Sequence, residues 1–177
     1  FIFFLIRLPS LFEPHWYGDE GIYQAIGMAM QKGEFLYRDI WDNKPPFLYL
    51  IYAIFAGNQF FVRSASLVVG ILSVVVFYAL SKKIFSNPKW VPLLTSSFFA
   101  LFLGLPLIEG NIANAENFMM LPILIAAFLV FSYSLSPNKF FLVFSGFLLS
   151  LAFLFKIVAV FDMAAFFLFV FFVIYKD

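Results

Sequence analysis

Two adjacent carboxylates, Asp19 and Glu20, follow the first apolar run and lie between Tyr17 and Tyr23. A carboxylate in such a place can take a proton from an acceptor hydroxyl or hold a metal ion. The alternative is a helix start, with Asp19 as the N-cap and an acidic first turn favoured by the helix dipole. The pair therefore predicts either an acid–base site or a capped helix.

A lysine stands directly before a Pro-Pro helix start in the segment Asp42-Asn43-Lys44-Pro45-Pro46. The ammonium group of Lys44 beside the positive end of a helix dipole suits a phosphate. The alternative is a lysine that extends to the lipid headgroups. Tyr37 and Trp41 fit either interpretation, as interface anchors or as the lining of a sugar site.

Four further charged residues lie at the ends of long apolar runs: Arg63, Glu116, Lys156 and Asp162. A charge at the middle of a bilayer costs about 2.5–3.5 kcal/mol on insertion scales. We therefore expect these residues near the outer membrane surface or facing a watery cavity. Helix capping and extension to the headgroups are the alternatives for each.

Several other kinds of site are excluded by residue types. The chain has no cysteine and one histidine, so it contains neither a thiolate zinc site nor a histidine zinc cluster. His15 is better explained as an interface residue than as a ligand. A formal net charge of +1 excludes a strongly basic nucleic-acid binder. No P-loop, dinucleotide-binding glycine pattern or nucleophile elbow occurs.

The composition indicates which elements position these residues. Hydrophobic residues make up 64% of the 177-residue chain, charged residues only 12%, and Phe alone occurs 29 times. The mean hydropathy is +0.99. Soluble domains are about 45–50% apolar and about 25% charged, so the chain belongs to the membrane class. We expect an all-α, polytopic transmembrane helical bundle.

A membrane-spanning helix needs about 20 apolar residues. Dividing the apolar runs by this length predicts six helices, which belong to one domain over residues 1–177. The last apolar run, 140–175, is too long for one crossing and divides at Lys156–Asp162. The chain reads as the N-terminal part of a transmembrane domain truncated at both ends. The expected helices are 1–12, 60–80, 90–108, 118–135, 140–155 and 163–175.

The charges of the loops predict how the chain is oriented across the membrane. Lysines gather in the loops 81–89 and 136–139 and at Lys176, and the positive-inside bias makes this side cytoplasmic. The long loop 13–59 then faces outside, in a multi-pass protein of the cytoplasmic membrane. It contains two short interfacial helices, one from Asp19 to about Lys32 and one from Pro46 to about Phe55.

The motifs resemble a known family. Tyr17-Gly-Asp-Glu-Gly-Ile-Tyr-Gln-Ala and Gly33-Glu-Phe-Leu-Tyr-Arg-Asp-Ile-Trp-Asp-Asn-Lys-Pro-Pro-Phe-Leu-Tyr are similar to the first periplasmic loop of GT-C glycosyltransferases. The closest group contains the protein O-mannosyltransferases and the aminoarabinose transferase of lipid A. Further similar segments are Phe61-Val-Arg-Ser-Ala-Ser, Asn114-Ala-Glu-Asn-Phe and Leu149-Ser-Leu-Ala-Phe-Leu-Phe-Lys.

The resemblance implies roles. Asp19 would be the general base for the acceptor hydroxyl, supported by Glu20, and Lys44 would bind the phosphate of a polyprenyl-phosphate sugar. A divalent cation assists some members, but Asn43 stands where the aminoarabinose transferase has a metal-binding Glu. Asp42 could substitute, so metal use stays open. The residues implied to line the cavity are Tyr23, Asp42, Arg63, Glu116 and Lys156.

The expected function is sugar transfer from a polyprenyl phosphate to a hydroxyl of a lipid, glycan or protein on the outer face of the membrane. We expect the segment to be inactive by itself. Two alternatives are a polytopic transporter and a non-catalytic scaffold subunit of an envelope complex. A transporter would place ionisable residues near the bilayer midplane, and a scaffold would not need Asp19, Glu20 and Lys44 to meet in one cavity.

Overall fold

The computed structural model describes residues 1–14, 17–85 and 87–174. Within these residues the secondary structure is helical and contains no β-strand, which confirms the all-α expectation. The elements are α1 (Ile2–Arg7), η1 (Pro9–Leu11), α2 (Gly18–Gln31), α3 (Pro46–Ile54), α4 (Gln59–Ile84), α5 (Val91–Gly104), η2 (Pro106–Ile108), α6 (Ala115–Leu135), α7 (Lys139–Phe155) and α8 (Ala159–Ile174).

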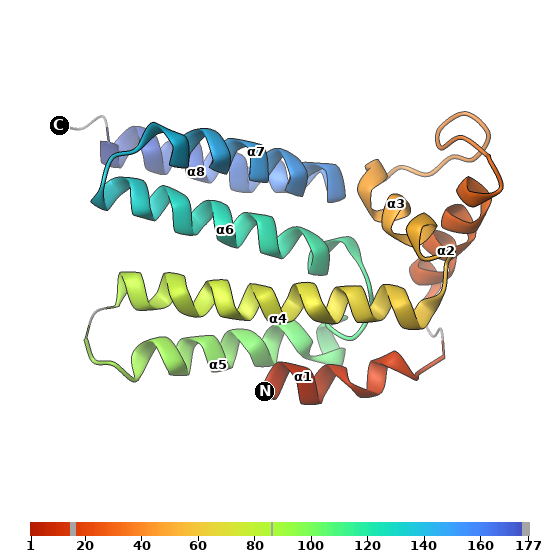
Figure 1. Ribbon diagram of the computed structural model, residues 1–177, viewed down its shortest axis with the longest axis horizontal. Helices are drawn as coiled ribbons and strands as arrows, with labels where there is room; N and C mark the ends of the chain where they lie inside the picture. The colour runs from red at the N-terminus through yellow and green to blue at the C-terminus, as the bar shows by residue number, and fades with distance from the viewer. Residues whose placement is uncertain (15–16, 86, 175–177) are drawn as a thin grey trace.

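The helices form a bundle with a separate cap at one end (Figure 1). Helices α1, α4, α5, α6, α7 and α8 lie side by side along the long axis, whereas α2 and α3 gather beyond the first turn of α4. We call this the α2–α3 end. The helix-to-helix contacts are most extensive for the pairs α6–α7, α4–α6, α2–α3 and α4–α5.

Helix length and apolar surface suit a bilayer. Among the described residues, α4 with 26 residues and α6 with 21 are long and apolar enough to cross a membrane. At 1.5 Å per residue, α4 exceeds the roughly 30 Å of the hydrocarbon core. The apolar helices α5, α7 and α8 are shorter, with 14, 17 and 16 residues. Only 33% of the apolar window of α4 or α6 is buried inside the protein, so most of it faces outward.

Local sequence explains several helix ends. The side chains of Asn58, Asn114 and Asn138 cap α4, α6 and α7 by accepting hydrogen bonds from backbone N–H groups of the first turn. Pro46 is the first residue of α3, as expected. Gly33, which follows the C-cap residue of α2, has a φ of +94°, a conformation that glycine adopts without strain.

Two expectations about helix starts were wrong. Tyr17 occupies the N-cap position of α2, and Asp19 lies inside the first turn without a capping bond. Helix α8 begins at Ala159, so Asp162 belongs to its first turn and not to a loop 156–162. A carboxylate in a first turn is stabilised by the helix dipole, which accounts for both positions.

Other helix boundaries differ by a few residues from those expected from the sequence. The helix expected over 90–108 ends at Gly104, because Pro106 disfavours a helical conformation in the residue before it. Helix α4 continues to Ile84 and has Lys82 and Lys83 in its last turn, where cations complement the dipole. The break between the last two helices was confirmed at 156–158. His15, Tyr175 and Lys176 lie outside the described residues.

The core nearest the α2–α3 end fixes the crossing of these two helices. It contains Tyr23 and Ile26 of α2 with Leu48, Tyr49 and Tyr52 of α3. A Cβ atom on Gly27 would lie 2.7 Å from the carbonyl carbon of Tyr52, so the crossing requires a glycine there. This close crossing holds the start of α2 beside the loop that leads into α3.

Candidate functional site

Asp19, Tyr23 and Lys44 meet in one polar cluster at the α2–α3 end. The Nζ atom of Lys44 lies 2.7 Å from Oδ2 of Asp19 and donates a second hydrogen bond to the Tyr23 hydroxyl. That hydroxyl donates to the same Asp19 oxygen at 2.9 Å. Asp19 and Tyr23 are four residues apart and therefore share one face of α2. The predicted base and the predicted phosphate ligand are thus in contact.

The charges in this cluster are set by their neighbours. The hydrogen bond from the Lys44 ammonium lowers the pKa of Asp19 below its ordinary value, against the opposing effect of burial, and the Tyr23 hydroxyl lowers it further. Burial and the Asp19 carboxylate raise the pKa of Tyr23. At neutral pH Asp19 is therefore a carboxylate and Tyr23 a neutral phenol. The side chains of Asp19 and Lys44 are 41% and 24% exposed, so a ligand can reach both.

A second ion pair lies at the same end of the bundle. Lys156 follows the last residue of α7 and pairs with Glu116 in the first turn of α6. The charge of Lys156 also lowers the pKa of Asp19, and the rings of Phe47 and Phe155, which lie near Lys44 and Lys156 in sequence, are in contact. Both of these predicted cavity residues therefore lie near the Asp19 cluster.

Asp42 has a supporting position. Its carboxylate accepts hydrogen bonds from the Tyr49 hydroxyl at 2.6 Å and from the backbone N–H of Asn43 at 2.6 Å. Tyr37 donates its hydroxyl proton to the carbonyl oxygen of Lys44 at 2.5 Å. These bonds hold the backbone on both sides of Lys44, and the Asp42 carboxylate itself does not join the Asp19 cluster.

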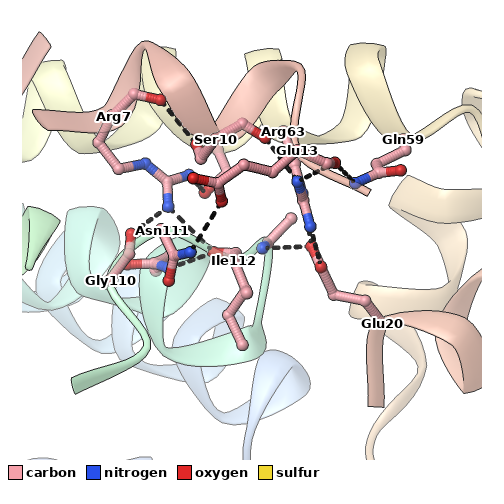
Figure 2. A network of polar contacts seen from close by, with 12 residues as sticks. Arg7, Ser10, Glu13, Glu20, Gln59, Arg63, Gly110, Asn111 and Ile112 are labelled. Atoms are coloured by element: carbon pink, nitrogen blue, oxygen red, sulfur yellow. Dashed lines mark hydrogen bonds and ion pairs between the residues drawn. The ribbon is translucent and has the colours of Figure 1, made fainter. Parts of the chain in front are cut away.

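The side chain of Glu20 belongs to a buried network (Figure 2). Its two carboxylate oxygens accept from Nε and Nη2 of Arg63 at 3.1 and 2.5 Å, and both side chains are almost fully buried. One of these oxygens also accepts the backbone N–H of Ala113 at 2.9 Å. Adjacent helix residues point about 100° apart, which explains why Asp19 and Glu20 face different partners.

The network continues through residues that the sequence analysis did not select. Arg63 donates to the carbonyl oxygens of Ser10 and Glu13. Arg7 is fully buried and donates to the carbonyl oxygens of Gly110 and Ile112, as Figure 2 shows. The signal for Arg7 was present: a single charge within the apolar run Phe1–Leu8 needs a buried partner. The network connects α1, α2, α4 and the segment 110–113.

An apolar groove of about 440 Å³ runs beside the polar cluster, between α3, α4, α6 and α7. Phe47 in its wall is three residues beyond Lys44, and Phe155 directly precedes Lys156. The two rings lie edge to face, with centroids 5.5 Å apart. The groove is lined by Phe47, Ile51, Phe55, Ala65, Val69, Phe118, Leu121, Pro122, Ile125, Leu148, Leu151 and Phe155.

The described residues do not assemble a metal site from protein ligands alone. No group of three or more His, Asp or Glu side chains is close enough to hold an ion in this part of the chain. Asp42, the proposed substitute for a family metal ligand, is already engaged by Tyr49 and Asn43.

Comparison with known protein families gives a match. A family model described as dolichyl-phosphate-mannose-protein mannosyltransferase matches residues 44–176. No curated protein and no solved structure matches the chain. The match includes Lys44, Arg63, Glu116 and Lys156 and begins after Asp19 and Glu20.

Proposed function

Because the chain belongs to the dolichyl-phosphate-mannose-protein mannosyltransferase family, a family of GT-C membrane glycosyltransferases, we propose that it transfers a sugar from a polyprenyl phosphate to an acceptor hydroxyl. Asp19 is the general base and Lys44 binds the donor phosphate. The observation that carries this proposal is the contact between an accessible carboxylate and an accessible ammonium group, 2.7 Å apart. One group suits a hydroxyl proton and the other suits a phosphate.

The transfer step uses both charges. Asp19 takes the proton of the acceptor hydroxyl while the acceptor oxygen forms a bond to the anomeric carbon of the sugar. The bond between that carbon and the phosphate oxygen breaks, and the electron pair leaves with the polyprenyl phosphate. The leaving phosphate gains one negative charge, which the Lys44 ammonium stabilises.

Donor binding would also make Asp19 a better base. Without a donor, the Lys44 hydrogen bond lowers the pKa of Asp19 and so weakens its affinity for a proton. A donor phosphate competes for the Lys44 ammonium and adds a negative charge near Asp19. Both effects raise the pKa of Asp19 toward the operating pH, where general-base catalysis is most efficient.

The apolar groove supports a lipid-linked donor. Its walls are almost entirely aliphatic and aromatic, and its volume of about 440 Å³ suits a branched hydrocarbon chain. Because Phe47 and Phe155 adjoin Lys44 and Lys156 in sequence, a chain in this groove would carry its phosphate toward the two lysines. The family description makes a polyprenyl-phosphate mannose the first donor to test.

Glu20 contributes by positioning. Its bidentate bond to Arg63 and its bond to the N–H of Ala113 hold the first turn of α2 against α4 and the segment before α6. Asp19 is the neighbouring residue in that turn. We assign Glu20 the role of fixing the direction of Asp19 and no contact with the reacting atoms.

The position of the charges favours this proposal over a transporter or a scaffold. Asp19, Lys44, Glu116 and Lys156 gather at the α2–α3 end, and a transporter would carry its ionisable residues near the midplane. A scaffold does not require a carboxylate and an ammonium group held together in an accessible cluster. With Lys82 and Lys83 on the cytoplasmic side by the positive-inside bias, the cluster faces outside.

The deciding experiment follows transfer of a labelled sugar to the acceptor. Purified full-length protein in liposomes is given a polyprenyl-phosphate mannose with labelled sugar and an acceptor extract from the same membranes. Transfer by the wild type together with its loss in Asp19→Asn, at unchanged donor binding, is the expected result. Donor binding that is absent in the wild type, or equal transfer by both proteins, would contradict the proposal.

A further inference from the structure

Helix α4 ends at the end of the bundle opposite α2 and α3 (Figure 1). A second hollow, far from Asp19, lies beside the last turns of α4. It has a volume of about 460 Å³ between α4 and α6. Its floor comes from one face of α4, since the residues concerned are spaced by three or four positions. The lining residues are Val75, Tyr78, Ala79, Lys82, Lys83 and Phe128.

Both lysines are held at this hollow. The Nζ atom of Lys83 lies 4.4 Å from the ring centroid of Phe128 and donates to Oγ of Ser132 at 2.5 Å. The Nζ atom of Lys82 lies 5.6 Å from the ring centroid of Tyr78. Throughout the described part of the chain, no carboxylate forms an ion pair with either lysine. Two positive charges with remaining N–H donors therefore border one hollow.

The surface next to the hollow is apolar. Val68, Leu72 and Val75 follow one another along the same face of α4 and are 55%, 46% and 58% exposed. On a helix long enough to cross a membrane, such a face contacts lipid chains. The pair of lysines thus lies where the headgroup of a lipid would be if its chains packed on this face.

We propose that this hollow binds the phosphate of an anionic glycerophospholipid. Lys82 and Lys83 donate to the phosphate oxygens, and one acyl chain lies along Val75, Leu72 and Val68. A free phosphate would fill the charged rim but would leave the apolar face unused. This site is separate from the donor cluster, so it does not depend on the proposed glycosyl transfer.

The test measures lipid binding by native mass spectrometry of the detergent-purified protein with phosphatidylglycerol or phosphatidylcholine. A lysine near a membrane surface contributes about 1 kcal/mol toward an anionic lipid, so Lys82→Gln with Lys83→Gln should weaken phosphatidylglycerol binding about thirtyfold. The control, Lys89→Gln with Lys139→Gln, removes the same charge from the same end outside the hollow. This control variant should change the affinity for phosphatidylglycerol less than about threefold.

Three results would overturn the site. They are an equal loss in the control variant, equal affinity of the wild type for phosphatidylglycerol and phosphatidylcholine, and displacement of the bound lipid by millimolar inorganic phosphate. Lys82→Arg with Lys83→Arg keeps both charges and should keep the binding. If the glutamine variant fails to fold, the arginine variant and the two-lipid comparison of the wild type still decide the proposal.

Discussion

The Nζ atom of Lys44 lies 2.7 Å from Oδ2 of Asp19, although 25 residues separate them along the chain. The contact depends on the close crossing of α2 and α3 at Gly27, which brings the loop before α3 to the first turn of α2. Both side chains are partly exposed, and exposed ion pairs add little to stability. Substitutions in this pair should therefore change chemistry much more than folding.

Asp19→Asn should abolish most sugar transfer. The amide keeps the size of the side chain but cannot accept the acceptor proton, and a general base typically contributes about 10²–10⁴-fold in rate. Donor affinity should be unchanged or higher, because Lys44 no longer has a carboxylate partner. Single-turnover transfer with a labelled donor measures the rate. Asp39→Asn, which changes an exposed carboxylate paired with Arg38, is the matched control.

Lys44→Gln should weaken donor binding. A hydrogen bond to a charged group is worth about 1.5–3 kcal/mol, which corresponds to about a 10- to 150-fold higher Kd for the polyprenyl-phosphate sugar. Equilibrium binding of the labelled donor in detergent gives this ratio. Lys32→Gln, at the exposed end of α2, removes the same charge and should leave the Kd unchanged. Equal Kd values for wild type and Lys44→Gln would remove Lys44 from the donor site.

Tyr23→Phe should move the acid limb of the pH profile of kcat/KM to higher pH. The Tyr23 hydroxyl lowers the pKa of Asp19, so its removal should raise that pKa toward the ordinary Asp value of about 3.9. Asp19 is an active base only when ionised, above its pKa. The fall in kcat/KM on acidification should therefore begin at a higher pH in Tyr23→Phe than in the wild type, with little change at pH 7.

The pH profile of kcat/KM for Tyr23→Phe is measured together with a circular dichroism spectrum at each pH, so that acid unfolding is distinguished from titration of Asp19. Tyr133→Phe, a hydroxyl near the end of α6 remote from Asp19, is the control and should keep the wild-type profile. An acid limb that stays in place or moves to lower pH would show that the Tyr23 hydroxyl does not act on the base.

The sequence predicted the helices better than the directions of the side chains. Apolar runs and their charged interruptions located α4, α6 and the break at 156–158, because these features are local. Glu20 was expected to support Asp19, yet Glu20 is buried against Arg63 and Asp19 is accessible. Helix geometry predicts that the side chains of Asp19 and Glu20 point in different directions. Which of the two faces the core depends on Arg63, which lies 43 residues after Glu20.

Local sequence indicates that Arg7 needs a buried partner, but it does not identify that partner. Its partners are carbonyl oxygens of Gly110 and Ile112, more than 100 residues away. Backbone carbonyls exist at every residue, so residue types alone do not identify these acceptors. The types and positions of Asp19 and Lys44 indicated a proton acceptor and a phosphate ligand, and the family resemblance implied their roles, but only the structure places their charged atoms in contact.

The orientation of the bundle can be tested with single cysteines, since the chain has none. Glu34→Cys, in the loop after α2, should react with a membrane-impermeant maleimide in intact cells. Lys139→Cys, at the start of α7, should react only after the cells are permeabilised. Both residues are exposed, so lack of reaction is not explained by burial. Reaction of Lys139→Cys alone in intact cells would reverse the orientation.

Glu20→Gln should destabilise the protein, unlike Asp19→Asn. Removing one partner of a buried ion pair typically costs about 3–5 kcal/mol, because the other charge stays buried without compensation. Here the Arg63 guanidinium would keep its bonds to the carbonyl oxygens of Ser10 and Glu13 and lose its carboxylate. Thermal unfolding in detergent should show a large drop in Tm. Glu34→Gln, an exposed carboxylate, should show none.

The transfer rate and the Tm together distinguish the role of Glu20 from the role of Asp19. If Glu20 only positions the first turn of α2, Glu20→Gln should lower the transfer rate of the folded fraction less than about tenfold, well short of the 10²–10⁴-fold expected for a lost base. Replacing both partners with methionine should recover much of the Tm, because apolar replacements of a buried pair are often neutral. A Glu20→Gln protein that folds like the wild type and transfers no sugar would assign Glu20 to the reacting centre.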